Sequence, residues 1–473
     1  MNKRAGKFFA VIILALALVF TFTTTAMAED ENTEINPDGV PVTVHLAVSE
    51  TIKYDMNLQV SGTLTYEFTV NEEKAGINIS GKPGTGGMMS DTFVKAGETV
   101  TKSRELEAGE YTVILTNDST NRMEADCTYK ISFKPSGETY GKQNNTIETA
   151  SGPLTMGKKI TGFFAMNDSV DIYKIDLKNS GRVTLKVSDI NATMLTLMDG
   201  QGNSVPAYPT TLGTSKSSTS ASYDLLKGVY YAKFERTGNS GIYHLVASFK
   251  DANETYVDKL GSTKVLNGST SIKLNKVVKG QLAENDEDDL YTVYIPKAGD
   301  YNITVKVDSS YKAKVWPFSV DSLYKSAKYD TRAEYSNQDS ELQKTFIYRG
   351  LKKGKYYVYL KKGSDSSPAT GPYSFVVKPA PVNNYKPVAG KKKLTAKWEK
   401  GTGTGYQVQI ALNKSFTSGK KSATITKAST VSKVFKSLKA KKKYYVRVRS
   451  YVSYNGTKYY SAWSNKTYVT TKG

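Results

Sequence analysis

Few residues in this sequence could carry out catalysis. The chain of 473 residues has two histidines, His45 and His244, and one cysteine, Cys127, so an intrachain disulfide is excluded. A nucleophile needs a neighbouring base, and a strand histidine without such a partner more often packs or faces solvent. The G-x-S-x-G, H-E-x-x-H and P-loop motifs are absent from the sequence. A pair of catalytic carboxylates, as in a glycosidase, remains an alternative, because the spacing of acids in the sequence does not exclude such a pair. We expect a protein that is not an enzyme.

Binding of polyanions is the second chemistry that the residue types suggest. Residues 381–473 hold 21 Lys and Arg but one acid, Glu399, whereas the preceding 380 residues are nearly neutral. The positive electrostatic field of so many uncompensated basic side chains attracts polyanions in a salt-dependent way. The alternative is that the lysines keep a β module soluble and guard its strand edges. The candidate polyanion-binding residues are Lys391, Lys392, Lys393, Lys441, Lys442, Lys443, Arg447 and Arg449.

The stretch KKKYYVRVRSYVSYNG (441–456) shows how a strand would present part of this charge. Side chains alternate between the two faces of a strand. One face would carry Tyr444, Val446, Val448, Ser450 and Val452, and the other Tyr445, Arg447, Arg449 and Tyr451. The second face is therefore the candidate binding surface, and Asn455-Gly456 predicts a type I′ hairpin turn. Nucleic acid is disfavoured by the extracellular location that the first residues of the chain predict, and a stacking platform beyond Tyr445 and Tyr451 is not evident.

The first residues predict export. Lys3, Arg4 and Lys7 form a charged head, an apolar run follows, and Ala26-Met27-Ala28 supplies a small-x-small cleavage site. This pattern is typical of a signal peptide over residues 1–28, since the apolar run is too short to span a membrane. We do not expect a transmembrane segment after signal cleavage. We expect an extracellular protein, either free or associated with the cell wall.

The elements that must position these residues are short strands. Alternating runs separated by Gly, Ser, Asn and Lys recur at spacings near ten residues, which is typical of β-sandwiches. Two segments repeat with an offset of 118 residues, so that Gly162 corresponds to Gly280 and Asp171 to Asp289. The predicted organisation is a linker at 29–36, a divergent β-sandwich at 37–135, related sandwiches at 136–250 and 251–380, and a basic domain at 381–473 that opens with a linker-like stretch, 381–387.

The repeated segments resemble the bacterial pre-peptidase C-terminal (PPC) domain family. The resemblance lies in the D-x-Y strand before a glycine turn, the L-x-x-G-x-Y-Y hairpin at 225–231 and 351–357, and the closing G-x-Y. It implies tandem jelly-roll-like β-sandwiches of the kind appended to secreted peptidases. Through the related collagen-binding modules of collagenases, it also implies a calcium site. Asn144, Asn145, Asp168 and Asp171 stand at the matching positions, and the alternative is that these are solvated turn residues.

Residues 381–473 resemble a fibronectin type III domain, an immunoglobulin-like β-sandwich. The matching residues are Trp398, Leu438, Tyr444 and the ending Y-S-A-W-S with Trp463. The resemblance implies a structural role for these four residues, and the Tyr444 hydroxyl would bond a nearby backbone group.

Together these features predict a secreted binding or adhesion protein. Its expected partners are an anionic cell-wall polymer, a glycan or an extracellular matrix protein. The alternative is an accessory, substrate-binding partner of a secreted peptidase or glycoside hydrolase. A cofactor is not expected, apart from the calcium that the resemblance makes possible.

Overall fold

The computed structural model describes residues 33–81, 88–117, 123–141, 143–189, 193–205, 211–212, 218–256, 270–284, 288–307, 334–335, 343–361 and 370–473. These residues form strands and no helix, which confirms the prediction of an all-β fold. Accordingly, the described part of the chain contains no helix that could cross a membrane. The predicted signal peptide, residues 1–28, lies outside the described residues.

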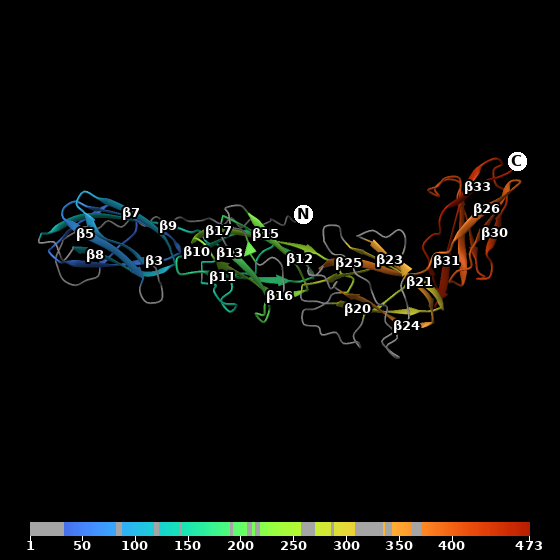
Figure 1. The fold of residues 1–473 in the computed structure, drawn as a ribbon, viewed down its shortest axis with the longest axis horizontal. Helices are drawn as coiled ribbons and strands as arrows, with labels where there is room; N and C mark the ends of the chain where they lie inside the picture. The colour runs from blue at the N-terminus through green and yellow to red at the C-terminus, as the bar shows by residue number, and fades with distance from the viewer. Residues whose placement is uncertain are drawn as a thin grey trace, which may run out of the picture.

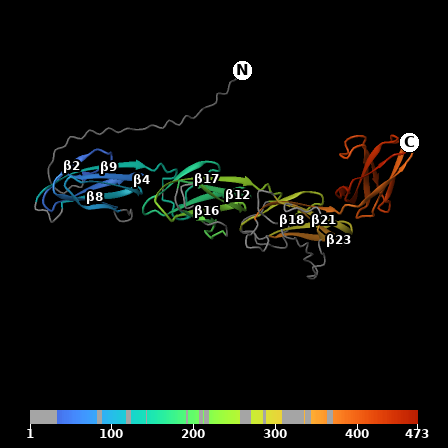
Figure 2. The same cartoon turned by 45° about the horizontal axis from the view of Figure 1, so that its top comes forward.

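Four units of paired sheets follow one another along the chain (Figure 1). The first three lie in a row and the fourth is turned away from their line, and a second view shows the same elongated arrangement (Figure 2). Each unit buries its own hydrophobic cluster, so the chain is a series of tandem β-sandwiches.

The first unit joins a five-stranded sheet, β1-β3-β8-β5-β6, to a four-stranded sheet, β2-β9-β4-β7. Its strands are β1 (Thr33–Glu34), β2 (Val42–Leu46), β3 (Thr51–Leu58), β4 (Gly62–Val70), β5 (Lys74–Gly81), β6 (Met88–Lys95), β7 (Thr99–Leu106), β8 (Gly109–Asn117) and β9 (Ala125–Pro135). The unit begins inside the predicted linker 29–36, because β1 pairs with β3 and Ile35 enters the core.

The second unit contains two four-stranded sheets, β10-β17-β12-β15 and β11-β16-β13-β14. Its strands are β10 (Lys159–Phe164), β11 (Val170–Leu177), β12 (Gly181–Ser188), β13 (Thr193–Asp199), β14 (Thr211–Leu212), β15 (Thr219–Leu225), β16 (Gly228–Arg236) and β17 (Gly241–Asp251).

The third unit pairs a three-stranded sheet, β18-β20-β24, with a five-stranded sheet, β19-β25-β21-β23-β22. Its strands are β18 (Thr270–Ile272), β19 (Val278–Leu282), β20 (Asp288–Ile295), β21 (Gly299–Val307), β22 (Glu334–Tyr335), β23 (Gln343–Leu351), β24 (Gly354–Lys361) and β25 (Gly371–Pro379).

The fourth unit has one sheet of β26-β27-β30 and another built on β29-β28-β31-β32, with β33 also paired to β31. Its strands are β26 (Asn384–Gly390), β27 (Lys393–Trp398), β28 (Gly405–Ala411), β29 (Lys421–Ile425), β30 (Ser432–Phe435), β31 (Lys443–Tyr454), β32 (Thr457–Tyr460) and β33 (Thr467–Thr470). The linker expected at 381–387 is therefore wrong beyond residue 383. Pro387 is tolerated in β26 because the register shifts between Tyr385 and Val388.

A tyrosine stabilises each of four corners where the chain crosses from one sheet of a unit to the other. The hairpins expected at 225–231 and 351–357 are therefore wrong, because β15 and β16, and likewise β23 and β24, lie in different sheets. In every case the tyrosine lies two residues after a turn glycine, and its hydroxyl donates to the backbone oxygen four residues earlier. These bonds join Tyr111 to Glu107, Tyr230 to Leu226, Tyr301 to Lys297 and Tyr356 to Lys352, at 2.8–3.0 Å. Three of these tyrosines belong to the repeated L-x-x-G-x-Y pattern, and Tyr301 shares only its G-x-Y part. The G-x-Y part thus fixes the strand after the turn.

Candidate functional site

A buried tyrosine–carboxylate cluster explains the repeated residues of the second unit. The Tyr243 hydroxyl donates to Asp171 Oδ2 at 2.5 Å and lies 2.6 Å from the Tyr173 hydroxyl. Gly162 makes room for it, because a Cβ there would stand 2.2 Å from the Tyr243 ring. Asp171 therefore bonds a tyrosine rather than the backbone amides expected of a solvated turn residue.

The third unit repeats this cluster. The Tyr373 hydroxyl donates to Asp289 Oδ2 at 2.5 Å and lies 2.7 Å from the Tyr291 hydroxyl, beside Gly280. Burial raises the pKa of Tyr373 well above its ordinary value, and it does the same for Tyr243. Both hydroxyls thus stay protonated, and each can donate to its carboxylate.

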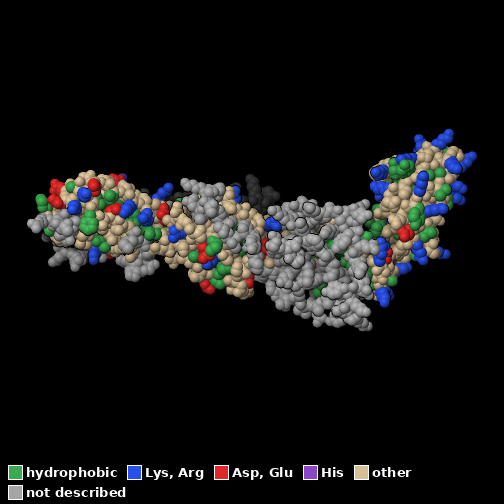
Figure 3. Space-filling model, in the orientation of Figure 1, with side chains coloured by type: hydrophobic (Ala, Val, Ile, Leu, Met, Phe, Trp, Pro, Cys, Tyr) green, Lys and Arg blue, Asp and Glu red, His purple; other side chains and the backbone are tan. Residues whose placement is uncertain are grey.

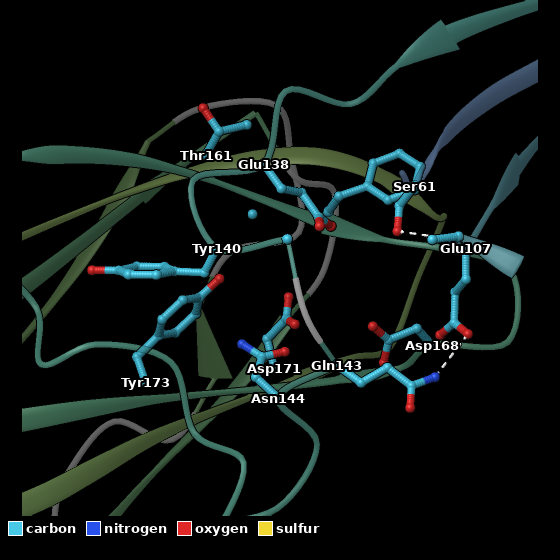
Figure 4. Close-up of a pocket in the computed structure, with 14 residues that line it drawn as sticks. Ser61, Glu107, Glu138, Tyr140, Gln143, Asn144, Thr161, Asp168, Asp171 and Tyr173 are labelled. Atoms are coloured by element: carbon cyan, nitrogen blue, oxygen red, sulfur yellow. Dashed lines mark hydrogen bonds between the residues drawn. The ribbon is translucent and has the colours of Figure 1, made fainter. Parts of the chain in front are cut away.

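Acidic side chains from two units surround a small cavity beside the first of these clusters. The cavity has a volume of about 110 Å³ and lies where the first unit meets the second (Figure 4). Its lining includes Glu107 of the first unit and Glu138, Asp168 and Asp171 of the second. Gln143 Nε2 crosses this joint and donates to Glu107 Oε2 at 3.0 Å. We call these four acids the joint carboxylates.

The joint carboxylates hold their protons more tightly than ordinary acids. Burial, followed by the negative charges of Asp168 and Glu107, raises the pKa of Glu138 to about 7. Burial raises the pKa of Asp168 to about 6, although a hydrogen bond from the Val170 amide opposes the shift. Burial also raises the pKa of Asp171, well above its ordinary value, and that of Glu107. The cavity is therefore a place where negative charge is poorly solvated.

The structure brings the four predicted calcium ligands together. The Asn144 side chain interacts with Asp171, and the Asn145 side chain interacts with Asp168. Asn144 Nδ2 also lies 3.4 Å from the Ile172 carbonyl oxygen. Carboxylate and amide oxygens are the donors that calcium takes, so the residue types fit this ion. Within the described ranges, however, no three acidic, His or Cys side chains converge as metal ligands do. Calcium binding stays a prediction.

Sequence reasoning missed Glu107 and Glu138 as members of this site. Glu107 lies in the β7–β8 turn of another unit, and Glu138 lies between β9 and β10. The family resemblance that pointed to Asn144, Asn145, Asp168 and Asp171 concerns residues of a single repeat. Glu138 lies close to the predicted boundary between two repeats, which is the signal that could have found it, whereas Glu107 lies well before that boundary and carries no such signal.

A basic tip occupies one end of the fourth unit. The segments 390–393, 436–443 and 471–473 meet there through bonds from the Lys392 amide to Lys472 O, from Leu438 N to Lys392 O and from Thr471 N to Lys442 O. Figure 3 shows Lys and Arg gathered at this end of the molecule. The tip, as we define it, comprises the exposed side chains of Lys391, Lys392, Lys393, Lys436, Lys439, Lys441, Lys442, Lys443 and Lys472.

Arg447 and Arg449 lie outside the basic tip, in a stacked ladder. The Arg447 guanidinium carbon lies 4.2 Å from the Phe416 ring centre and 4.1 Å from that of Trp463. The Arg449 guanidinium carbon lies 4.4 Å from Trp463 and 3.9 Å from Tyr460. The nitrogens of these arginines also donate to Gln409 Oε1 and Gln407 Oε1, respectively. Both guanidinium faces are thus occupied within the unit, and desolvation lowers the pKa of each group.

The predicted faces of β31 hold with one exception. Tyr444, Val446, Val448, Ser450 and Val452 are buried as one face. Tyr451, placed on the exposed face by alternation, is also buried, because its hydroxyl donates to the Ile425 carbonyl oxygen across β28 at 3.1 Å. Asn455 and Gly456 both have positive φ, at 45° and 74°, in the turn that follows.

The four predicted structural residues all lie within the fourth unit. Trp398 and Leu438 are in the buried core, and Trp463 lies between the two arginines of the ladder. The Tyr444 hydroxyl accepts a hydrogen bond from the Lys439 amide at 3.1 Å.

The histidines and the cysteine do not form a nucleophile–base pair among the described residues. His244 Nδ1 lies 2.7 Å from Asp189 Oδ2, and the Ser188 hydroxyl donates to that same carboxylate oxygen rather than to the histidine. His45 lies against Asp126, whose hydrogen bond raises the histidine pKa. Burial raises the pKa of Cys127 to about 11, so its thiolate is scarce at neutral pH.

The chain is similar in sequence to part of a collagenase. It is 23% identical over 362 residues to collagenase ColA of Clostridium perfringens (strain 13 / Type A). The match covers 73% of this chain but 30% of that protein, so the chain spans about a third of its relative. A search of family models gives no match.

Two solved structures illustrate the likeness of this chain to known folds. The β-1,2-glucanase of Parabacteroides distasonis matches 39% of this chain and 31% of its own. The FN1–FN3 domains of chicken CNTN1 match 64% of this chain and 97% of their own. Each is 12% identical with a TM-score of 0.17, which is too low to carry an argument.

Proposed function

We propose that this chain is an exported protein that acts by binding rather than by catalysis, and that its basic tip holds an anionic polymer of the cell wall. The observation that carries the proposal is the gathering of nine exposed lysines from three segments at one end of the fourth unit. Glu399, the one acid of residues 381–473, accepts a hydrogen bond from Asn383 near the start of the unit.

The chemistry of the tip favours a flexible polyanion. Lysine is a compact point charge on a long stem, so a lysine cluster matches the charge of a phosphate or carboxylate polymer without fixing its geometry. Lys443 Nζ lies 3.7 Å from the Tyr468 ring centre, which gives the tip an aromatic flank. Arg447 and Arg449 are excluded from the proposed surface because the ladder occupies them.

Co-sedimentation of the full chain with purified wall of a Gram-positive bacterium tests the proposal. We expect retention at low salt and release at about 1 M salt, where the Debye length is near 3 Å. Changing Lys391, Lys392, Lys393, Lys441, Lys442 and Lys443 to Gln should weaken retention at least about tenfold.

A matched control variant changes six exposed lysines of the first two units to Gln: Lys53, Lys95, Lys134, Lys158, Lys186 and Lys227. Both variants lose the same total charge, so equal retention by the two would contradict a localised site. Absence of retention at low salt in the unmodified chain would overturn the proposal.

The second candidate function is that of an accessory, substrate-binding partner of a secreted peptidase. The similarity to a 362-residue segment of a collagenase favours it. Retention on fibrillar collagen that persists at about 1 M salt and survives the six-lysine change in the tip would support this function over wall binding.

A further inference from the structure

A groove on the outer face of the first unit is a separate candidate binding site. It has a volume of about 420 Å³ and lies over β3, β5, β6 and β8. This volume falls in the range of ligand sites. The basic tip and the joint carboxylates contribute nothing to it, so its chemistry has to be considered by itself.

One wall of the groove carries an exposed aromatic ring in a strained backbone. Phe93 is 61% exposed and has φ of 67°. A bulky residue in this left-handed region is an outlier, which persists only where the surrounding structure enforces it. The cause is a bulge, in which Thr92 and Phe93 of β6 oppose Gly76 of β5.

The bulge is held from beneath. Asp91, the residue before it, accepts hydrogen bonds from the Tyr66 hydroxyl at 2.6 Å and from Lys102 Nζ. Gly76 lies under the bulge, where an added Cβ would stand 3.2 Å from Asp91 O. The Phe93 ring is therefore presented by a fixed backbone, which lowers the entropy cost of using it as a contact.

The opposite wall is fixed as well. The turn between β2 and β3 carries Ser49, which also lines the groove and has φ of 62°. Asn117 Nδ2 holds this turn by donating to the carbonyl oxygens of Leu46 and Ala47, at 3.2 and 2.9 Å. Both walls thus stay in place without a ligand.

The lining selects the class of ligand. None of the 11 lining residues carries a charge, and their polar groups are hydroxyls and amides, on Ser49, Thr51, Asn78, Thr92, Thr116 and Asn117. The Asn78 amide oxygen is buried and lacks a hydrogen-bond partner among the described residues. This oxygen is out of reach of a molecule in the groove, so the polar groups open to a ligand are the exposed hydroxyls of Ser49, Thr51 and Thr92.

We propose that this groove binds a neutral glycan, with a sugar ring stacked on Phe93 and its hydroxyl groups paired with the hydroxyls of Ser49, Thr51 and Thr92. A sugar offers an apolar ring face, which can stack on the Phe93 ring, and many hydroxyl groups, which can bond the polar side chains of the lining. The site extends the proposed binding function to a second ligand and does not depend on the basic tip.

Affinity electrophoresis of the full chain in gels containing dextran, mannan or a soluble β-glucan tests the proposal. Binding is also measured by calorimetry at about 1 M salt, which suppresses the basic tip, so failure of either site can be recognised separately. We expect at least one polysaccharide to retard the chain. Phe93→Gly should weaken this binding about tenfold or more, whereas Phe93→Tyr should keep it within about threefold.

The Gly variant separates binding from folding. Glycine accepts a left-handed backbone at no steric cost, so Phe93→Gly should melt at the same or a higher temperature while it loses the glycan. Tyr385→Ala, which removes another exposed aromatic in the fourth unit, is the matched control and should bind normally.

Three outcomes would overturn the proposal. The first is that none of the polysaccharides retards the unmodified chain. The second is that Phe93→Gly binds as the unmodified chain does. The third is that gelatin, rather than a polysaccharide, binds with the same dependence on Phe93, which would make the groove a peptide site.

Discussion

At the scale of residues, the joint carboxylates give the protein an unusual response to pH. Most carboxylates of folded proteins have depressed pKa values, and their contribution to stability is lost in acid. Here burial raises the pKa of Glu138 to about 7 and that of Asp168 to about 6. The native state thus binds protons that the unfolded state releases, and the free energy of unfolding falls as pH rises through this window.

The variant Glu138→Gln should therefore stabilise the second unit at pH 8 and change little at about pH 3, where the acid is protonated in both states. After allowance for solvent screening, we expect a gain of roughly 1 kcal/mol, or about 4–8 °C in the melting temperature of this unit. Differential scanning calorimetry of the full chain across this pH range measures the effect.

Glu67→Gln, which removes an exposed acid on β4, is the control and should leave the pH profile unchanged. Identical profiles for the two variants would contradict the expected effect of Glu138.

Repeating the scans at pH 8 with excess calcium and with chelator tests the predicted calcium ligands Asn144, Asn145, Asp168 and Asp171. An ion held there would raise the melting temperature of the unmodified chain.

The sequence predicted part of this site and not the rest. Asn144, Asn145, Asp168 and Asp171 lie in one repeat, so a resemblance within that repeat located them together. Glu107 reaches the cavity only because two units meet, and that contact leaves no periodicity in the sequence. The bond from Tyr243 to Asp171 was also missed, since 72 residues separate its partners.

At the scale of elements, strand alternation predicts which face of β31 a residue occupies, but it does not predict what that face touches. Arg447 and Arg449 alternate with buried valines as expected. Their surroundings are supplied by Phe416, Tyr460 and Trp463, from other loops and strands. A face expected to bind polyanions is therefore largely engaged in packing.

The variant Arg447→Lys tests this assignment, because it keeps the charge and removes the planar group. A lysine cannot stack between two rings while donating twice to Gln409, so we expect the fourth unit to lose about 1–3 kcal/mol of stability. Thermal and urea unfolding measure the loss. Retention on cell wall at low salt should stay within about twofold at a temperature where the unit is folded.

Lys391→Arg, at an exposed position of the basic tip, is the companion control and should change neither quantity. Should Arg447→Lys instead weaken wall binding tenfold without loss of stability, the arginine would belong to the binding surface after all.

At this scale the sequence predicted most of the fold, namely the strands and their division into sandwiches. Turn glycines, alternating apolar residues and the repeated tyrosines are local signals, and they predicted sandwiches in tandem. The errors arose where a tertiary contact overrides the local signal. Ile35 and Asn384 both lie in polar segments that resemble linkers, yet Ile35 enters the first core and Asn384 donates to the Val446 carbonyl oxygen inside the fourth unit.

At the scale of the whole molecule, direct hydrogen bonds connect successive units. Between the first and second units, the Met166 amide donates to Glu105 O. Between the second and third, Gln281 Nε2 donates to Leu225 O at 3.1 Å. Between the third and fourth, the Asp300 amide donates to the Thr402 hydroxyl, and the Tyr294 ring packs against Tyr454. These bonds set the direction of each unit relative to the one before it.

The last joint matters most for the proposed function, because it sets the direction in which the basic tip points. Thr402→Val keeps the size of the side chain but removes the hydroxyl that accepts from Asp300. A side chain at the surface of the fourth unit contributes little to the core of either unit, so both melting transitions should stay within about 0.5 kcal/mol of the original. Small-angle scattering should show a broader distribution of interatomic distances, since relative motion between the domains of one chain is expected unless their interface is large and apolar.

Thr395→Val, on β27 and outside the joint, provides the comparison and should leave the scattering profile unchanged. A fall in the stability of the fourth unit on Thr402→Val would show that the joint is part of that unit's fold. An unaltered distance distribution would show that the aromatic contact between Tyr294 and Tyr454 is sufficient to hold the angle. If the distribution broadens while wall retention at low salt is preserved, the tip binds independently of its orientation, as expected for a lysine cluster that recognises charge rather than shape.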